Sequence, residues 1–149
     1  MTAGSMWDKY IVTEPKFLTE MAHHDFRDVS GFTFPDEVYL DRDLCGEANT
    51  WLDIVWVWDE TVPRELPGLH SHPFSEIVLL VGSDPKDLRD LGGELEWGMV
   101  EGADAATYTL TSTTAIYVPG GVPHGPLIYN RVDRPILNIA IGLQAGDYE

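Results

Sequence analysis

The stretch GLHSHPFSE, residues 68–76, carries the strongest structural signal in this 149-residue chain. It contains His70, His72 and Glu76, and the spacings between them are all even. Side chains alternate between the two faces of an extended strand, so even spacing places all three on one side of a regular strand. Two imidazoles and a carboxylate that converge from one face suit a divalent transition metal. A carboxylate facing an apolar interior also needs a counter-charge, which a metal supplies.

A second informative stretch is YVPGGVPHGP, residues 117–126, in which a strand pattern ends shortly before a histidine. Pro119 and Pro123 flank a pair of glycines that allow the chain to reverse direction. Such a turn can aim His124 back toward the preceding strands. The sequence alone leaves open whether the two stretches meet in space. It also leaves open that the first two histidines are a surface pair beside a chance glutamate.

Together, HxHxxxE and the later PxGxxH resemble the paired motifs of the cupin superfamily. The matching residues are His70, His72 and Glu76 in the first motif, and Pro119, Gly121 and His124 in the second. The resemblance covers about residues 50–142 and implies an all-β fold, the cupin double-stranded β-helix or jelly-roll barrel. It implies that the three histidines and the glutamate hold one divalent transition metal ion inside the barrel mouth. The family uses Fe, Mn, Zn, Ni or Cu, and we expect Fe or Mn.

The chain departs from the cupin pattern at turn and packing positions. Arg64 and Thr113 stand where the family carries glycine, and Ile128 stands where it carries asparagine. Gly82 lies one residue before the expected closing glycine of the first motif. None of these is a ligand position, so the departures bear on the subfamily more than on metal binding.

Short β-branched and aromatic runs, separated by many of the 14 glycines and 10 prolines, predict strands rather than helices. The predicted strands are 51–58, 75–81, 94–100, 106–111, 114–118 and 135–141, with a hairpin turn at 101–105. Short helices are predicted at 14–22 and 84–91. We interpret residues 1–149 as a single domain in which residues 1–49 form an N-terminal arm that packs on the barrel.

Four aromatic residues are candidates for the wall of a substrate pocket. Trp56 and Trp58 share one face of a predicted strand, and packing in the core is the alternative for both. Phe74 and Tyr117 lie close to the ligand motifs in the sequence and carry the same ambiguity.

The chain has 9 Lys and Arg against 25 Asp and Glu, which gives a formal net charge of −16. Nucleic-acid phosphates and anionic membrane surfaces repel such a chain, so we expect neither as a partner. No apolar run is long enough to cross a bilayer, no signal peptide is apparent, and Cys45 is the single cysteine. These features favour a soluble cytoplasmic protein. The adjacent His23 and His24 are expected in a surface loop, with a place beside the pocket as the alternative.

We expect a small-molecule substrate, and a homodimer in which the arm covers a sheet edge of the partner. Three histidines and one glutamate leave an octahedral metal up to two open positions. The expected function is a dioxygenase-type oxidoreductase acting on a small apolar, aromatic or enolisable compound, with Glu76 as a catalytic residue. One alternative is a non-redox isomerase, epimerase, decarboxylase or cyclase, in which the metal is a Lewis acid and Glu76 either releases the metal or serves as base. The other is a protein that binds a small ligand without catalysis.

Overall fold

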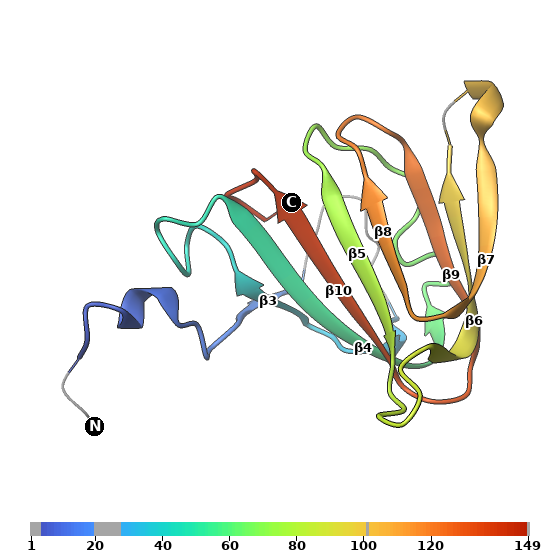
Figure 1. Ribbon diagram of the computed structural model, residues 1–149, viewed down its shortest axis with the longest axis horizontal. Helices are drawn as coiled ribbons and strands as arrows, with labels where there is room; N and C mark the ends of the chain where they lie inside the picture. The colour runs from blue at the N-terminus through green and yellow to red at the C-terminus, as the bar shows by residue number, and fades with distance from the viewer. Residues whose placement is uncertain (1–3, 20–27, 101, 149) are drawn as a thin grey trace.

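The computed structural model describes residues 4–19, 28–100 and 102–148. Within these residues, ten strands form two facing sheets (Figure 1). Two short 3-10 helices are the remaining elements. In chain order the elements are η1 (Asp8–Tyr10), β1 (Lys16–Leu18), β2 (Ser30–Phe32), β3 (Asp36–Leu40), β4 (Thr50–Val62), β5 (Glu76–Gly82), β6 (Asp90–Met99), η2 (Gly102–Asp104), β7 (Ala106–Ser112), β8 (Thr114–Val118), β9 (His124–Val132) and β10 (Ile136–Leu143).

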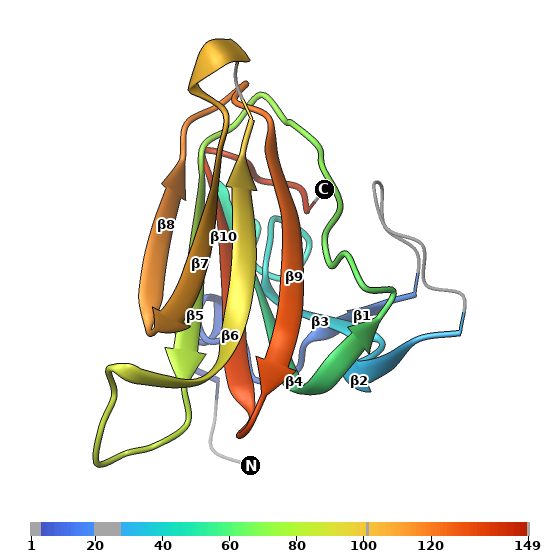
Figure 2. The same ribbon diagram turned by 90° about the vertical axis from the view of Figure 1, so that its right-hand side faces the viewer.

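The larger sheet, sheet A, has seven strands in the order β1-β3-β4-β10-β5-β8, with β2 paired to β4 off this path. The smaller sheet, sheet B, has three strands in the order β7-β6-β9. Figure 2 shows sheet B in front of β5 and β10 of sheet A. The last strand, β10, lies between β4 and β5 and pairs antiparallel with both. This double winding is the jelly-roll architecture that the sequence predicted.

The core lies between the two sheets and follows the alternation of side chains along each strand. In β4 the odd-numbered positions point inward, and Trp51 and Val57 are buried there. In β5, Val78 and Leu80 point inward. Sheet B contributes its own inward residues, among which Leu95, Trp97, Leu127 and Tyr129 are buried. The interior is therefore apolar, apart from a few polar groups described below.

All six predicted strands are confirmed, with boundaries that differ by a few residues, and β6 and β7 form the predicted hairpin. The strand β9 and the three short strands β1, β2 and β3 were not predicted. Residues 16–18 and 30–40 supply those three strands, so part of the predicted arm belongs to sheet A itself.

Both predicted helices are wrong. Residues 16–18 form a strand, and residues 20–22 lie outside the described residues. Residues 84–89 form consecutive turns, in which the carboxylates of Asp84 and Asp87 each accept the backbone N–H two residues later, at 2.9 and 3.2 Å. Such bonds compete with the hydrogen bonds of a helix, which explains the failure of the pattern.

No helix in the described ranges is long and apolar enough to cross a membrane. His23 and His24, which were expected in a surface loop, lie outside the residues that the structure describes. The segment before β1 carries η1 and reaches away from the edge of sheet A (Figure 1).

Candidate metal centre

The four predicted ligands, His70, His72, Glu76 and His124, lie together where β5 and β9 begin. One ligand atom from each residue lies within 4.8 Å of the corresponding atom of every other. Glu76 and His124 are buried, and the other two are half-buried. Opposed ligands of an ion with bonds near 2.1 Å are about 4.2 Å apart, so the cluster needs only a small contraction to hold one.

Backbone hydrogen bonds join the two ligand stretches. His70 and His124 form an antiparallel bridge, in which each N–H donates to the other's carbonyl, at 3.0 and 2.9 Å. In the turn between β8 and β9, the Gly121 N–H donates to the carbonyl of His72 at 2.7 Å. The two stretches therefore meet, a question that the sequence left open.

Regular strand alternation is not what brings the first three ligands together. β5 begins at Glu76, and His70 and His72 precede it in an irregular segment. The sequence argument from a regular strand is therefore wrong for the two histidines, although both side chains reach the cluster. The bridge to His124 orients His70 instead.

Each histidine of the cluster donates its Nδ1–H to a backbone carbonyl. The pairs are His70 with Gly68, His72 with Phe74 and His124 with Val122, each at 2.8 Å. A carbonyl can only accept, so Nδ1 carries a proton in each ring and Nε2 is the nitrogen left to face a metal ion. Metal-binding histidines usually have the second ring nitrogen fixed in this way, which sets both tautomer and orientation.

The Nε2 atoms meet one carboxylate. Nε2 of His72 lies 2.6 Å from Oε2 of Glu76. Nε2 of His124 lies 3.6 Å from the same oxygen, too far for a hydrogen bond, and it is buried without a partner among the described residues. An unsatisfied buried nitrogen costs about 1–3 kcal/mol, which a metal ion at this position would remove. The donor set therefore fits a transition metal ion.

The protonation states also suit a metal. Burial alone would raise the pKa of Glu76, but the adjacent imidazoles of His124 and His72 lower it to about 2. Burial lowers the pKa of His70. Burial also acts to lower the pKa of His72, but the bond to Glu76 outweighs it and the net shift is upward. Glu76 is thus a carboxylate and His70 a neutral imidazole near neutral pH, the forms that bind metals.

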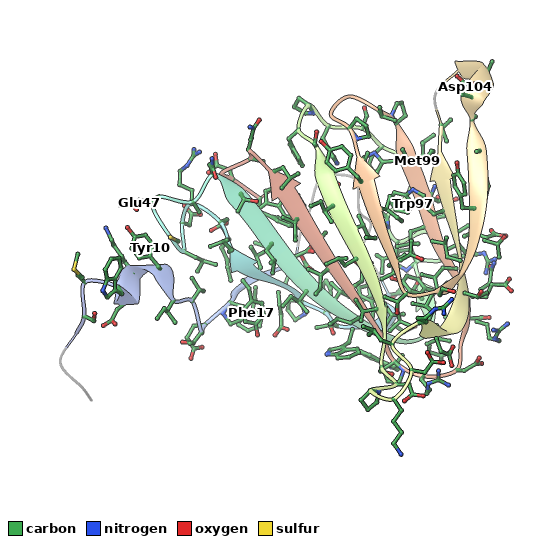
Figure 3. The ribbon with its side chains drawn as sticks, in the orientation of Figure 1. Tyr10, Phe17, Glu47, Trp97, Met99 and Asp104 are labelled. Atoms are coloured by element: carbon green, nitrogen blue, oxygen red, sulfur yellow. The ribbon has the colours of Figure 1, made fainter. Side chains whose placement is uncertain are left out.

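Aromatic rings pack against the ligands on two sides. The Phe74 ring stacks on His72 with centroids 4.0 Å apart, and Trp51 contacts Phe74 edge-on at 5.8 Å. Figure 3 labels Trp97 on β6, and the centroid of its ring lies 5.8 Å from that of His124. Sequence reasoning did not name Trp51 or Trp97 as site residues. The pattern that could have identified them is the alternation of side chains between the two faces of each strand, which places each tryptophan on the inward face.

Of the four aromatic residues predicted to wall a pocket, Phe74 and Tyr117 line a groove of about 1080 Å³, whereas Trp56 and Trp58 are not among its lining residues. Trp56, Trp58 and Tyr117 are 42%, 53% and 59% exposed and occupy positions that point away from sheet B. The two tryptophans are not in the core either, because the odd-numbered positions of β4 face inward. Phe74 is the one of the four that contacts a ligand of the cluster.

Comparison with protein-family profiles finds no match, and comparison with curated proteins finds none. Solved structures do match. A mutant of Bacillus subtilis oxalate decarboxylase gives a TM-score of 0.52 at 19% sequence identity, over 76% of this chain and 27% of that one. Hydroxypropylphosphonic acid epoxidase from S. wedmorenis gives 0.53 at 12% identity, over 89% of this chain and 57% of that one. An oxalate oxidase gives 0.51 at 15% identity, over 78% and 53%.

These similar structures are cupin-fold proteins, and this chain has the cupin fold with a His-His-Glu-His cluster. At such low identities the likeness shows the fold alone. This chain spans about a quarter of the decarboxylase and little more than half of the other two. Among the similar structures, the epoxidase (HppE) was solved with Fe(II), and the oxalate decarboxylase has Mn(II) centres.

Proposed function

We propose that this chain is a metal-dependent cupin enzyme that uses iron or manganese and dioxygen to oxidise a small apolar or aromatic substrate. The observation that carries the proposal is the set of three imidazoles, each fixed through Nδ1 by a backbone carbonyl, around one buried carboxylate. Neutral imidazoles and a carboxylate suit Fe(II) and Mn(II). The similar solved structures include an oxidase and an epoxidase, which supports the redox choice by analogy.

An iron or manganese ion in this cluster would supply a redox-active centre with open positions for substrate and dioxygen. The chain's own residues would have three tasks. The histidines hold the ion as neutral donors, and Glu76 compensates part of its positive charge. The rings of Phe74 and Trp97 exclude water beside the ligands.

The surroundings favour an uncharged substrate over a small di-acid. Within the described ranges no Lys or Arg side chain is buried, and Arg131 and Arg134 pair with surface carboxylates at 3.0 and 2.5 Å. A buried carboxylate without a cation is costly. The indole N–H groups of Trp51 and Trp97 are buried and unpartnered in the same ranges, so they offer neutral donors. We therefore propose an apolar or aromatic compound with enolisable or phenolic oxygens.

Metal analysis combined with oxygen uptake tests this function. Protein purified without added metal should contain iron or manganese, and should consume dioxygen with a member of a panel of catechols and β-diketones. His124→Ala should lose both metal and uptake, whereas Arg131→Ala, at the surface, should keep both. Equal turnover under strict anaerobiosis would contradict the proposal and support a non-redox isomerase, decarboxylase or cyclase. Ligand binding without turnover for any metal would support a binding protein.

The Glu76→Gln variant tests the role of the carboxylate. It keeps the shape of the side chain but removes the charge, so we expect metal affinity to fall by at least about tenfold. The matched control is Glu60→Gln, an exposed residue of β4, which should bind metal as the wild type does. Unchanged metal affinity in Glu76→Gln, measured by competition with a chelator, would remove Glu76 from the ligand set.

A further inference from the structure

Trp51, Gly142 and Glu76 form one row across three neighbouring strands of sheet A. Gly142 of β10 lies opposite Trp51 of β4 on one side and opposite Glu76 of β5 on the other (Figure 1). Residues directly opposite each other in a sheet point to the same face, and all three are buried on the inward face. The row therefore places a tryptophan and the carboxylate of the metal cluster on either side of a residue without a side chain.

The missing side chain of Gly142 gives the Trp51 ring its place. A Cβ atom on Gly142 would lie 2.1 Å from Nε1 of Trp51 and 2.2 Å from Cε2, so the nitrogen edge of the indole covers this glycine. Adjacent strands are about 4.8 Å apart, so an indole nitrogen above β10 is about halfway from β4 to β5. The N–H group of Trp51 therefore lies about one strand away from Glu76, the first residue of β5.

The Trp51 ring is packed tightly between other rings. Tyr148 meets it at 72° with centroids 4.6 Å apart, and Phe74 meets it at 87° with centroids 5.8 Å apart. Phe74 in turn stacks on the metal ligand His72. Since the ring is fixed from two sides, its N–H group has a defined direction in the wall behind the ligands.

The row contains an unused donor and an unused acceptor. The indole N–H of Trp51 is buried and has no hydrogen-bond partner among the described residues. Buried N–H groups are nearly always paired, so an exception requires an explanation. The contacts of Glu76 with His72 and His124 both use Oε2, which leaves Oε1 without a hydrogen bond within the described ranges.

Metal binding changes the partners that Glu76 can have. Nε2 of His72 and Oε2 of Glu76 lie 2.6 Å apart, whereas neighbouring ligands of an ion with bonds near 2.1 Å are at least about 3.0 Å apart. When both atoms bind an ion, their lone pairs point at it, so the hydrogen bond between them is lost and the carboxylate must turn. Carboxylates that bind metals are usually hydrogen-bonded by a further group, which fixes their orientation.

We propose that Trp51 is a positioning residue for Glu76, and that its indole N–H donates a hydrogen bond to Oε1 of the metal-bound carboxylate. This role rests on the metal site of the proposed function and is independent of the substrate. The hydrogen bond holds Oε1 away from the ion, so Glu76 binds through Oε2 alone. Binding through one oxygen keeps a further position on the ion open for another ligand.

NMR of the indole N–H groups, with zinc as the probe, gives the first test. Zinc suits a set of imidazoles and a carboxylate, and it is diamagnetic. The chain has five tryptophans, and the signal that Trp51→Phe removes is that of Trp51. Adding zinc to the metal-free wild type should move this signal downfield, because the N–H gains a charged acceptor. The signals of Trp56 and Trp58, which are exposed on the other face of β4, should stay in place.

A double-mutant cycle separates a hydrogen bond to Glu76 from simple packing. Zinc affinity is measured by competition with a chelator in the wild type, Trp51→Phe, Glu76→Ala and the double variant. Trp51→Phe should weaken binding by about tenfold in the wild type, but by less than about twofold when Glu76 is already alanine. Trp56→Phe is the matched control on the same strand and should bind zinc as the wild type does.

Equal weakening by Trp51→Phe in both backgrounds would show that the ring acts through packing, and would overturn the proposal. A Trp51 signal that stays in place while zinc binds would overturn it as well, and this measurement needs no variant that must fold beyond the one used for assignment. Either result would leave the metal site and the proposed function intact. If the wild type bound no zinc, iron or manganese, both would be overturned together.

Discussion

Asp53 is a buried carboxylate on the inward face of β4, apart from the metal cluster. The Tyr148 hydroxyl donates to it at 2.5 Å and the Ala140 N–H at 3.2 Å. Burial raises the pKa of Asp53 well above its usual value, and the nearby charge of Asp36 raises it further. Burial also raises the pKa of Asp36. The carboxyl pair of Asp53 and Asp36 therefore keeps a proton in the folded chain that the unfolded chain releases at about pH 3.9.

This proton makes stability depend on pH. A carboxyl group whose pKa is raised by folding stabilises the fold below the unfolded pKa, and that contribution is lost as pH rises through the folded pKa. Each unit of such a shift costs about 1.4 kcal/mol at high pH. Asp53→Asn mimics the protonated group, so it should raise the melting temperature at about pH 8 and have little effect at about pH 4. An unchanged slope of melting temperature against pH would contradict this.

The matched control is Asp59→Asn, because Asp59 is an exposed carboxylate of the same strand. It should leave the pH dependence of stability as in the wild type. A lone aspartate on the apolar face of residues 51–58 is visible in the sequence, but its partners are not. Asp36 and Tyr148 lie 17 and 95 residues away in the chain, and only the fold brings them to Asp53.

The turn between β8 and β9 positions His124, and glycine is required at its centre. A Cβ atom on Gly120 would lie 2.4 Å from the carbonyl oxygen of Pro73, in the segment that carries His72. Gly120→Ala should therefore push the two ligand stretches apart. Overpacking of this kind costs about 1–3 kcal/mol, and metal affinity should fall with stability. Urea unfolding and a metal titration measure the two effects.

Gly46→Ala is the control for this substitution, because nothing lies within 4 Å of a Cβ atom at Gly46. Its stability should stay within about 0.5 kcal/mol of the wild type. If Gly120→Ala behaved like Gly46→Ala in both measurements, close contact at this turn would not be what holds the ligand stretches together.

Alternation of β-branched and aromatic residues over five residues or more predicted strands such as 51–58 and 106–111, although the alternating strand β9 (His124–Val132) was missed. The short strands β1 and β2 have three residues each, too few for a period of two to be recognised. The prediction of a helix at 84–91 failed because side-chain hydrogen bonds to the backbone compete with helix formation. Helix propensities of single residues do not reveal such bonds. The spacing of the histidines and the glutamate was enough to predict which residues are candidate ligands. Their convergence depends on the His70–His124 bridge, which joins residues 54 positions apart.

The runs of β-branched and aromatic residues correctly predicted a mainly β fold, but they did not show which outward residues of neighbouring strands lie side by side on sheet A. Trp56 and Trp58 were pocket candidates because they share one face of a predicted strand, and Tyr117 because it lies near a ligand motif. The structure places all three on the side of sheet A that faces away from sheet B. Alternation along a single strand divides its residues only into inward core residues and outward exposed residues. A continuous outward surface becomes visible only with the register of neighbouring strands, which places the aliphatic residues of β5 and β10 side by side.

Metal binding should stabilise the whole molecule, because the cluster forms only when residues 68–76 and 117–126 are brought together by folding. A ligand that binds only the folded state at a hundred times its dissociation constant adds about 2.7 kcal/mol. For a chain of this size each kcal/mol corresponds to about 2–4 °C. Removing metal with a chelator should therefore lower the melting temperature of the wild type by about 5–10 °C. The double variant His70→Ala, His124→Ala should show no shift on chelation. A wild-type melting temperature insensitive to chelator, in protein shown to contain metal beforehand, would place the bound ion outside this cluster.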